Sequence, residues 1–305
     1  MGTPTFGARI LEELTKHHEI VLVVTQPDKK VGRAQAIEMS PVKEFALTHG
    51  LPLFQPVSIL KEADPILNIP CDLIVTAAYG QFIGTKVLTH PRLRSINVHG
   101  SLLPKYRGGA PIQRALMAGE TETGVTIMYM EKKMDSGDIL AQEKIKIERE
   151  DNAQTLFNKL AELGAKMILP AIKGLEDGTI TPIPQQEAEV TFANNLSKED
   201  ELLHFDREAS YLCNQMRGLC VNPGSYFTLD GVVYKIYEAE VVILDHDVAP
   251  GTIIEVGKNH FTIACLGDSA IKISSIKPEG RPLMSVGAFL NGKGKNIIIK
   301  NRRIL

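Results

Sequence analysis

The sequence has 305 residues, a formal net charge of −2 and 44% hydrophobic residues, which is an ordinary composition for a globular protein. At this length we expect two domains rather than one. The sequence contains no apolar run of about 18 residues, so we expect no membrane-spanning segment. Because the charge is near neutral, a nucleic-acid partner requires a local basic surface.

The four cysteines are scattered along the sequence, and none belongs to a CxxC pair. Such spacing favours reduced thiols over a disulfide framework or a metal site. The first residues also lack the charged and then apolar order of a secretory signal. We therefore expect a cytoplasmic protein without a metal site.

Short β-branched runs alternate with helix-like segments in the first part of the chain. A helical pattern that begins near Pro111 and ends near Gly119 has clear start and stop signals. Apolar strands separated by helices predict an α/β fold with a parallel sheet, and ligands bind such sheets beyond the carboxyl ends of the strands. The strands are expected at residues 19–26, 71–80, 95–100 and 123–131.

The composition changes after a helix that is expected at 153–176. The segment at 178–200 is polar, contains proline and has no helical period, which indicates a linker. One helical pattern follows, and then many short strand-like runs separated by turns such as Asp230-Gly231. Short strands with little helix predict a small all-β barrel or sandwich as the second domain.

Asn97 and His99 lie two residues apart in the expected strand 95–100. Alternate residues of a strand share a face, so both side chains point to the same side of the sheet. Asparagine can donate a hydrogen bond to a developing oxyanion, and histidine can move a proton near neutral pH. Asp135 follows the next strand in a loop, where it can orient the imidazole or help carry the proton. This set predicts acyl or formyl transfer to an amine.

A structural role for these residues stays open on the pattern alone, and the SLLP and RGGAP segments can form merely a rigid loop. The sequence has no GxGxxG motif, which argues against a nicotinamide or flavin cofactor. By themselves, the residues indicate an α/β enzyme with a candidate transfer site.

Longer segments carry a resemblance to a known family. The block INVHGSLLPKYRGGAPIQRALMAGETETGVTIM, together with MDSGDIL, closely resembles the folate-dependent formyltransferases, and the likeness extends over nearly the whole chain. The GAPIQ ending favours the members that act on methionyl-tRNA over the purine-pathway and sugar-nucleotide members. The resemblance implies a doubly wound, mostly parallel α/β domain with the formyltransferase fold, followed by a C-terminal OB-like β-barrel domain.

The activity that the resemblance implies is a formyl transfer for translation initiation. The formyl group would pass from 10-formyltetrahydrofolate, as co-substrate, to the free amino group of methionine on initiator methionyl-tRNA. The loop at 26–43 matches the insertion by which the family reaches the acceptor arm of the tRNA, and a solvated surface loop is the alternative. The residues so assigned are Asn97, His99 and Asp135 for catalysis, Ser101, Leu102, Leu103 and Pro104 for folate, and Lys29, Lys30 and Arg33 for tRNA.

Further basic residues between 293 and 303 suit either a second tRNA contact or merely a charged tail. The expected boundaries are a catalytic domain at 1–180, a linker at 181–200 and an OB-like tRNA-binding domain at 201–305. Family members usually have a further strand before the turn that corresponds to Gly2-Thr3-Pro4, so we expect the first strand of the sheet to be missing.

We expect a monomer, since nothing in the sequence indicates an obligate interface. Two alternative functions stay open. One is a folate-dependent formyltransferase that acts on a sugar-nucleotide amine. The other is a non-catalytic protein that binds tRNA or folate, which the loss of the first strand would favour.

Overall fold

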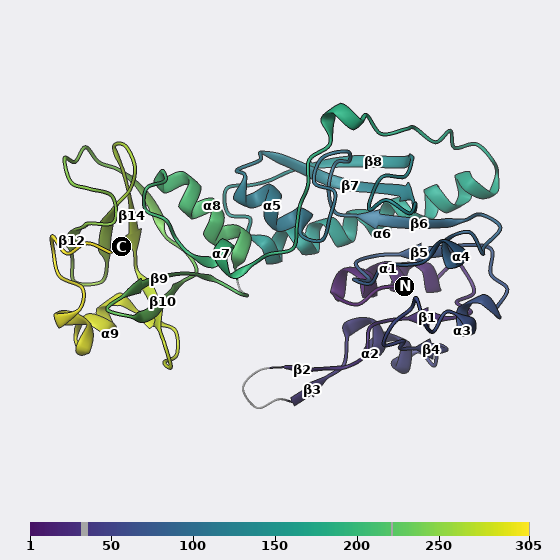
Figure 1. Ribbon diagram of the computed structural model, residues 1–305, viewed down its shortest axis with the longest axis horizontal. Coiled ribbons are helices and arrows are strands. Elements are labelled where there is room, and N and C mark those ends of the chain that lie inside the picture. Colours follow the sequence, from purple (N-terminus) through teal and green to yellow (C-terminus); the bar gives the residue numbers. More distant parts are fainter. Residues whose placement is uncertain (32–35, 221, 305) are drawn as a thin grey trace. The chain divides into compact units, whose positions relative to one another are not determined.

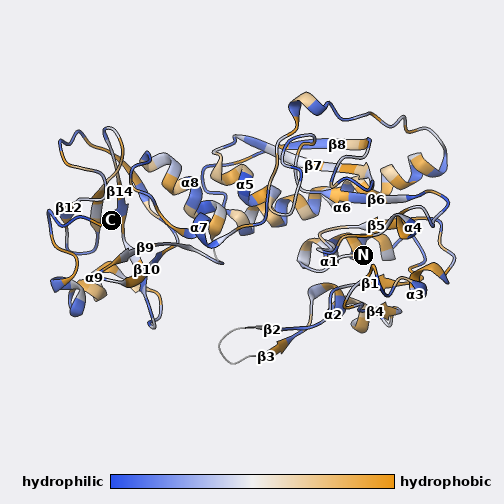
Figure 2. Cartoon of the chain, in the orientation of Figure 1, coloured by the Kyte–Doolittle hydropathy of each residue, from blue (hydrophilic) through white to orange (hydrophobic). Residues whose placement is uncertain are grey.

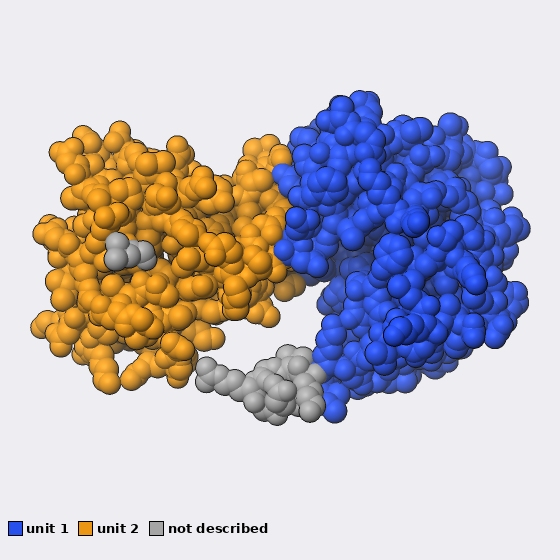
Figure 3. Space-filling model, viewed as in Figure 1, with its two compact units in different colours: residues 1–111, 122–147, 156–195 blue, residues 112–121, 148–155, 196–305 orange. Residues whose placement is uncertain are grey.

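The computed structural model describes residues 1–31, 36–220 and 222–304, and the chain forms two compact units, coloured separately in Figure 3. Within these ranges, no helix is both long enough and apolar enough to cross a membrane. The cysteines are free thiols, and burial raises the pKa of Cys265 to about 12, so this thiol stays protonated. Unit 1 comprises residues 1–111, 122–147 and 156–195, and unit 2 comprises residues 112–121, 148–155 and 196–305.

Unit 1 is an α/β unit whose main sheet has the strand order β5-β6-β7-β8 (Figure 1). β5 and β6 pair in parallel, and so do β1 and β4 in a separate pair. These parallel pairings between strands separated by helices confirm the expected α/β fold. The strands are β1 (Val23–Val24), β4 (Leu53–Phe54), β5 (Ile74–Thr76), β6 (Ser95–His99), β7 (Glu122–Tyr129) and β8 (Ile139–Lys146).

The other half of the main sheet is antiparallel, which the alternation of strands and helices does not indicate. β7 pairs antiparallel with both β6 and β8. The connection from β7 to β8 spans only residues 130–138, which is too short for the crossover that parallel neighbours need. It forms a loop instead, and this loop carries Asp135.

Met1 and Gly2 lie between β1 and β5, where the first strand of the sheet is expected to be missing. The Gly2 amide donates to the Val24 carbonyl over 3.0 Å, and the Ala77 amide donates to the Met1 carbonyl over 2.9 Å. Gly2 and Ala77 form one parallel bridge. A cavity of about 390 Å³ opens beside these residues, and apolar residues of β1 and β5 supply part of its wall. The first two residues therefore join the two parallel strand pairs.

Helices pack on the strands of unit 1 and hold β6 in place. The longest is α6 (Ala153–Glu176), which coincides with the expected helix and alternates between hydrophobic and hydrophilic positions in Figure 2. A Cβ added to Gly164 of α6 would lie 2.9 Å from the Val98 side chain, so the helix backbone lies close against β6. The other helices of unit 1 are α1 (Thr5–Thr15), α2 (Pro41–Thr48), α3 (Asp64–Leu67), α4 (Thr85–Leu88) and the 3₁₀ helix η1 (Glu187–Glu189).

A short hairpin leads from β1 to α2. Its strands β2 (Lys29–Val31) and β3 (Ala36–Glu38) pair antiparallel. Asp28 anchors the base of the hairpin, because its carboxylate accepts hydrogen bonds from Lys43 Nζ at 2.6 Å and from the Gln55 amide at 3.0 Å. These bonds fix the start of the segment that is expected to contact tRNA.

Unit 2 consists mainly of two four-stranded antiparallel sheets, with the orders β16-β15-β10-β9 and β11-β14-β13-β12. Residues from both sheets, including Phe227 and Ile263, share one buried apolar core. The expected all-β domain is confirmed, whereas closure into a single barrel stays a prediction. The strands are β9 (Ser225–Leu229), β10 (Val232–Ile236), β11 (Glu240–Ile243), β12 (Ile253–Val256), β13 (Phe261–Ala264), β14 (Ser269–Ile273), β15 (Ser275–Pro278) and β16 (Met284–Ser285).

The helices that accompany these sheets are short. α8 packs its apolar face, including Leu212 and Met216, into the core of unit 2. The helices are α5 (Pro111–Met117, of which Pro111 belongs to unit 1), α7 (Lys198–Glu201), α8 (Ala209–Leu219), α9 (Val286–Leu290) and the 3₁₀ helix η2 (Lys293–Asn296).

Candidate active site

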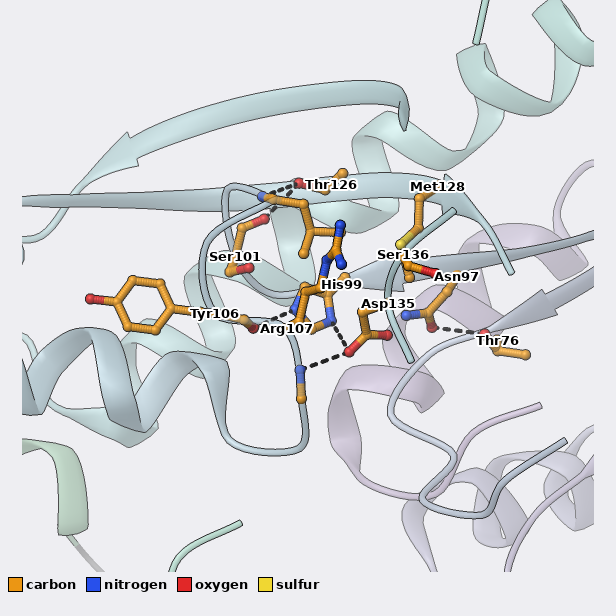
Figure 4. A network of polar contacts seen from close by, with 12 residues as sticks. Thr76, Asn97, His99, Ser101, Tyr106, Arg107, Thr126, Met128, Asp135 and Ser136 are labelled. Atoms are coloured by element: carbon orange, nitrogen blue, oxygen red, sulfur yellow. Dashed lines mark hydrogen bonds and ion pairs between the residues drawn. The ribbon is translucent and has the colours of Figure 1, made fainter. Parts of the chain in front are cut away.

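β6 places Asn97 and His99 at alternate positions, so their side chains leave the same face of the sheet, as the sequence predicts. The register puts Asn97 beside Thr76 of β5 and His99 beside Thr126 of β7. His99 is 5% exposed, and Asn97 is partly buried. Figure 4 shows both side chains clustered with Asp135.

Thr76 fixes the orientation of the Asn97 amide. The Thr76 hydroxyl donates a hydrogen bond to Asn97 Oδ1 over 2.7 Å. Because the amide oxygen is engaged in this way, the Nδ2 amino group forms the other end of the side chain, and Figure 4 shows it turned toward Asp135. Asn97 therefore presents hydrogen-bond donors to the cluster, as the stabilisation of an oxyanion requires.

A backbone carbonyl fixes the tautomer of His99. Nε2 lies 3.0 Å from the Tyr106 carbonyl oxygen, which can only accept, so Nε2 carries the proton of the neutral ring. Nδ1 is then the basic nitrogen, and it lies 3.8 Å from Asp135 Oδ2. The ring can therefore accept a proton on the side that faces the carboxylate.

Asp135 comes from the loop between β7 and β8, and the loop after β6 holds its carboxylate. Oδ2 accepts a hydrogen bond from the Gly108 amide over 2.8 Å. The side chain is 15% exposed. The structure thus brings together the three predicted catalytic residues, two from one strand and one from a loop.

The SLLP segment forms a turn that is fastened to β7. The Thr126 hydroxyl donates to the Ser101 carbonyl over 2.7 Å and accepts from the Leu103 amide over 3.1 Å. Leu103 is also buried, so its backbone and side chain are both engaged within the protein. Leu102 and Pro104 are the partly exposed members of the segment.

The polar groups that the site leaves for a ligand suit a reaction between a carbonyl and an amine. Asn97 Nδ2 can donate and His99 Nδ1 can accept. Across the described ranges, no group of three or more His, Cys, Asp or Glu side chains is placed to hold a metal ion.

The residues expected to contact tRNA lie in and beside the β2–β3 hairpin. Lys29 is exposed and lies opposite Glu38 in the hairpin ladder, and Lys30 is the next residue of β2. Arg33 lies outside the described residues. The hairpin is distant along the chain from the cluster around His99, and the prediction that it binds tRNA stays a prediction.

The basic residues near the C-terminus are partly engaged within unit 2. Arg302 forms an ion pair with Asp230, and Arg303 Nε donates to the Pro250 carbonyl over 3.1 Å. These contacts add a structural role to the two alternatives that the sequence leaves open for this segment.

Four polar residues of the site are not among those predicted from the sequence. A threonine inside an apolar strand was an available signal for Thr76 and Thr126, because a buried hydroxyl needs a partner. The sequence gives no such signal for a buried arginine in the RGGAP loop. The four residues are Thr76, Arg107, Thr126 and Gln142, whose amide donates to the Leu103 carbonyl and to the Thr126 hydroxyl.

Replacing Thr126 with valine tests how the SLLP turn is held. The change keeps the side-chain shape but leaves the buried Leu103 amide without its acceptor, so we expect unfolding in denaturant to show a loss of about 2 kcal/mol. Thr126→Ser keeps the hydroxyl and should lose less than half as much. Equal stabilities of the valine variant and the wild type would contradict the role of this hydroxyl.

The chain matches family models over most of its length. Residues 1–172 match the model described as Formyl transferase, and residues 195–294 match the one described as Formyl transferase, C-terminal domain. A methionyl-tRNA formyltransferase from Lactobacillus acidophilus is 46% identical over 301 residues, which cover 98% of this chain and 96% of that protein. One from Staphylococcus aureus is 42% identical over 306 residues, covering 100% of this chain and 98% of that protein.

Solved structures with low sequence identity share the fold. An N-formyltransferase from Helicobacter canadensis, in complex with folinic acid and dTDP-3-aminofucose, has a TM-score of 0.68 at 17% identity and covers 89% of this chain and 96% of its own. The sugar 3N-formyltransferase WlaRD, with dTDP and 5-N-formyl-THF, has a TM-score of 0.67 at 18% identity and covers 92% and 97%. The fold, the matched models and the full-length relatives agree, and the chain belongs to the formyl transferase family.

Proposed function

We propose that the chain transfers a formyl group from 10-formyltetrahydrofolate to the free amino group of methionine on initiator methionyl-tRNA. The observation that carries the proposal is the fixed orientation of two polar ends, a donor on Asn97 and an acceptor on His99. An amine that attacks a carbonyl needs both. Two relatives that are 46% and 42% identical to the chain over nearly its full length are methionyl-tRNA formyltransferases, which supports this choice of acceptor.

The proposed reaction forms one bond and breaks another at the formyl carbon. The methionine nitrogen attacks this carbon, and the bond from the carbon to N10 of the folate breaks. Asn97 Nδ2 donates to the formyl oxygen as negative charge develops there. His99 Nδ1 accepts the proton that the amine loses and delivers a proton to the departing N10.

Asp135 acts on His99 in this scheme. Its carboxylate lies 3.8 Å from Nδ1, so opposite charges face one another while the ring carries the proton. Proton transfer through these side chains uses no metal. Leu102 and Pro104, the partly exposed residues of the SLLP turn, would give the flat folate an apolar wall, which Ser101 and Leu103 hold from within.

The tRNA contact in this proposal is the β2–β3 hairpin. Lys29 is exposed there, and a lysine on a hairpin that is anchored at its base can reach a phosphate without distorting the unit. In the same proposal, Lys30 and Arg33 also bind phosphates of the tRNA.

The proposed activity is tested by incubating the protein with 10-formyltetrahydrofolate and charged initiator tRNA and measuring formyl-methionine. His99→Ala should lower kcat by about 100-fold or more, because it removes the general base, while the Kd for the folate stays within about twofold. If the wild-type protein formylates an amino sugar nucleotide and leaves methionyl-tRNA unmodified, the sugar-directed alternative replaces the proposal. Binding of tRNA without any turnover would favour a non-catalytic protein.

A second variant tests how the Asn97 amide is oriented. Thr76→Val keeps the shape of the side chain but removes the donor to Asn97 Oδ1, so the amide can turn its oxygen toward the formyl oxygen. Loss of one neutral hydrogen bond corresponds to a fall in kcat of about 5- to 10-fold, measured under saturating substrates. Thr76→Ser keeps the hydroxyl and should stay near the wild-type rate. A full rate in the valine variant would show that another group orients the amide.

The hairpin contact is tested by removing one charge. Lys29→Ala should weaken tRNA binding, and the slope of log K against log salt should fall by about 1, because one phosphate contact is lost. Lys61→Ala removes an exposed lysine elsewhere in unit 1 and serves as the matched control. Equal salt slopes for the two variants would favour the alternative of a solvated loop.

A further inference from the structure

The segment at 181–195, expected to be largely linker, is joined to unit 1 near both ends. Ile139 and Ile183 exchange backbone hydrogen bonds of 2.8 and 2.9 Å. Further along, the Arg107 amide donates to the Thr191 carbonyl over 2.9 Å. The residues between these two points are therefore held against the loops that follow β6 and β7.

The Gln185 side chain makes hydrogen bonds to the loops on both sides of this segment. Its Nε2 donates to the carbonyl oxygens of Asp135 at 2.9 Å and Gly137 at 2.8 Å. Its Oε1 accepts from Arg107 Nε at 3.0 Å. Because carbonyls only accept and a guanidinium only donates, the amide has a single orientation. Gln185 thus links the loop that carries Asp135 to the loop that carries Arg107.

Arg107 is 1% exposed, and charged neighbours fix it in turn. Its Nη1 donates to Glu187 over 3.0 Å, and Lys133 donates to the same carboxylate over 2.8 Å. The Lys133 hydrogen bond, and after it that from Arg107, hold the pKa of Glu187 below its usual range. Arg107 therefore presents Nε to Gln185 from a fixed position.

The loop after β7 has a backbone that needs such support. Asp135 has a φ of 48°, in the left-handed region that most residues avoid. A Cβ added to Gly137 would lie 1.9 Å from the Tyr129 carbonyl oxygen, so the loop returns close to its own strand. The two carbonyls that Gln185 binds lie on either side of Ser136. Loss of both donors would free these peptide groups to rotate.

We propose that Gln185 is a positioning residue for formyl transfer. By binding the carbonyls of Asp135 and Gly137, it holds the Asp135 carboxylate on the Gly108 amide and beside His99 (Figure 4 shows Asp135 next to His99). Arg107 assists by fixing the orientation of the amide. The inference deepens the proposed function and rests on it for the reaction, whereas the positioning itself can be measured without substrate.

Two variants separate the donor role of Gln185 from its volume. Gln185→Glu keeps the size and the acceptor for Arg107 but loses both donors, and Gln185→Ala removes the whole amide. Both should lower kcat by about 10-fold or more, with KM for each substrate within about twofold, because the residue acts through Asp135. Gln186→Ala, which removes the exposed neighbouring amide, should keep the wild-type kcat. A wild-type kcat in both Gln185 variants overturns the proposal.

A double-mutant cycle distinguishes positioning from a general structural role. In the Asp135→Asn background, Gln185→Ala should change kcat by less than about twofold, since the group that it positions no longer carries the charge that acts on His99. If the two effects multiply instead, Gln185 acts by another route and the proposal is wrong.

Amide hydrogen exchange gives a readout that needs no substrate. The Gly108 amide is protected by its bond to Asp135 Oδ2, so its exchange should rise by about tenfold in Gln185→Ala and stay unchanged in Gln186→Ala. If the wild-type protein forms no formyl-methionine but this exchange rises, the proposed function fails and the positioning stands. Unchanged Gly108 exchange in Gln185→Ala overturns the positioning even in an active enzyme.

Discussion

The hydrogen bond between the Gly108 amide and the Asp135 carboxylate is the contact on which the geometry of the site depends, because it joins the loop after β6 to the loop after β7. Tyr106, two residues before Gly108, supplies the carbonyl that fixes the tautomer of His99. One short stretch of backbone therefore sets both the protonation pattern of the imidazole and the place of its carboxylate partner.

Asn97 and His99 are held in the same way. Each has one end held by the protein and the other end directed into the cluster. Thr76 holds the oxygen of Asn97, and the Tyr106 carbonyl holds Nε2 of His99. An amide or an imidazole has two chemically different ends, so fixing one end selects the chemistry of the other. The polar groups of the site are thus oriented before a substrate binds. Electrostatic stabilisation is most effective when the groups that provide it are already in place.

Local patterns in the sequence account for much of the fold and for the centre of the site. The period of two along β6 is enough to place Asn97 and His99 on one face, and apolar periodicity is enough to predict α6. Strand direction is different, since it depends on how the chain returns. Strand β7 follows a helix, as the parallel strands do, and yet it pairs antiparallel. The expected substrates follow from the resemblance of longer segments to a known family, because no local pattern identifies them.

The support around the site could not be predicted for a different reason. Composition at 178–200 predicts a linker, but it does not show what the backbone of this segment pairs with. Gln185 and Glu187 lie 78 and 80 residues from Arg107 along the chain, so only the folded structure reveals that they contact it. A buried arginine leaves no signature in a sequence unless its partners are known.

Residues 183–193 are attached to β8 and to the RGGAP loop, so the protein cannot be shortened before this segment without losing contacts of unit 1. A fragment that stopped at residue 180, the expected end of the catalytic domain, would lack Ile183, the strand-like partner of Ile139. It would also lack Gln185, whose amide binds two carbonyls of the Asp135 loop. The backbone contacts of this segment continue as far as Ala193, whose amide donates to the Arg107 carbonyl, close to residue 195, where unit 1 ends. A segment whose composition suggests only a linker therefore belongs to the same compact unit as the candidate site.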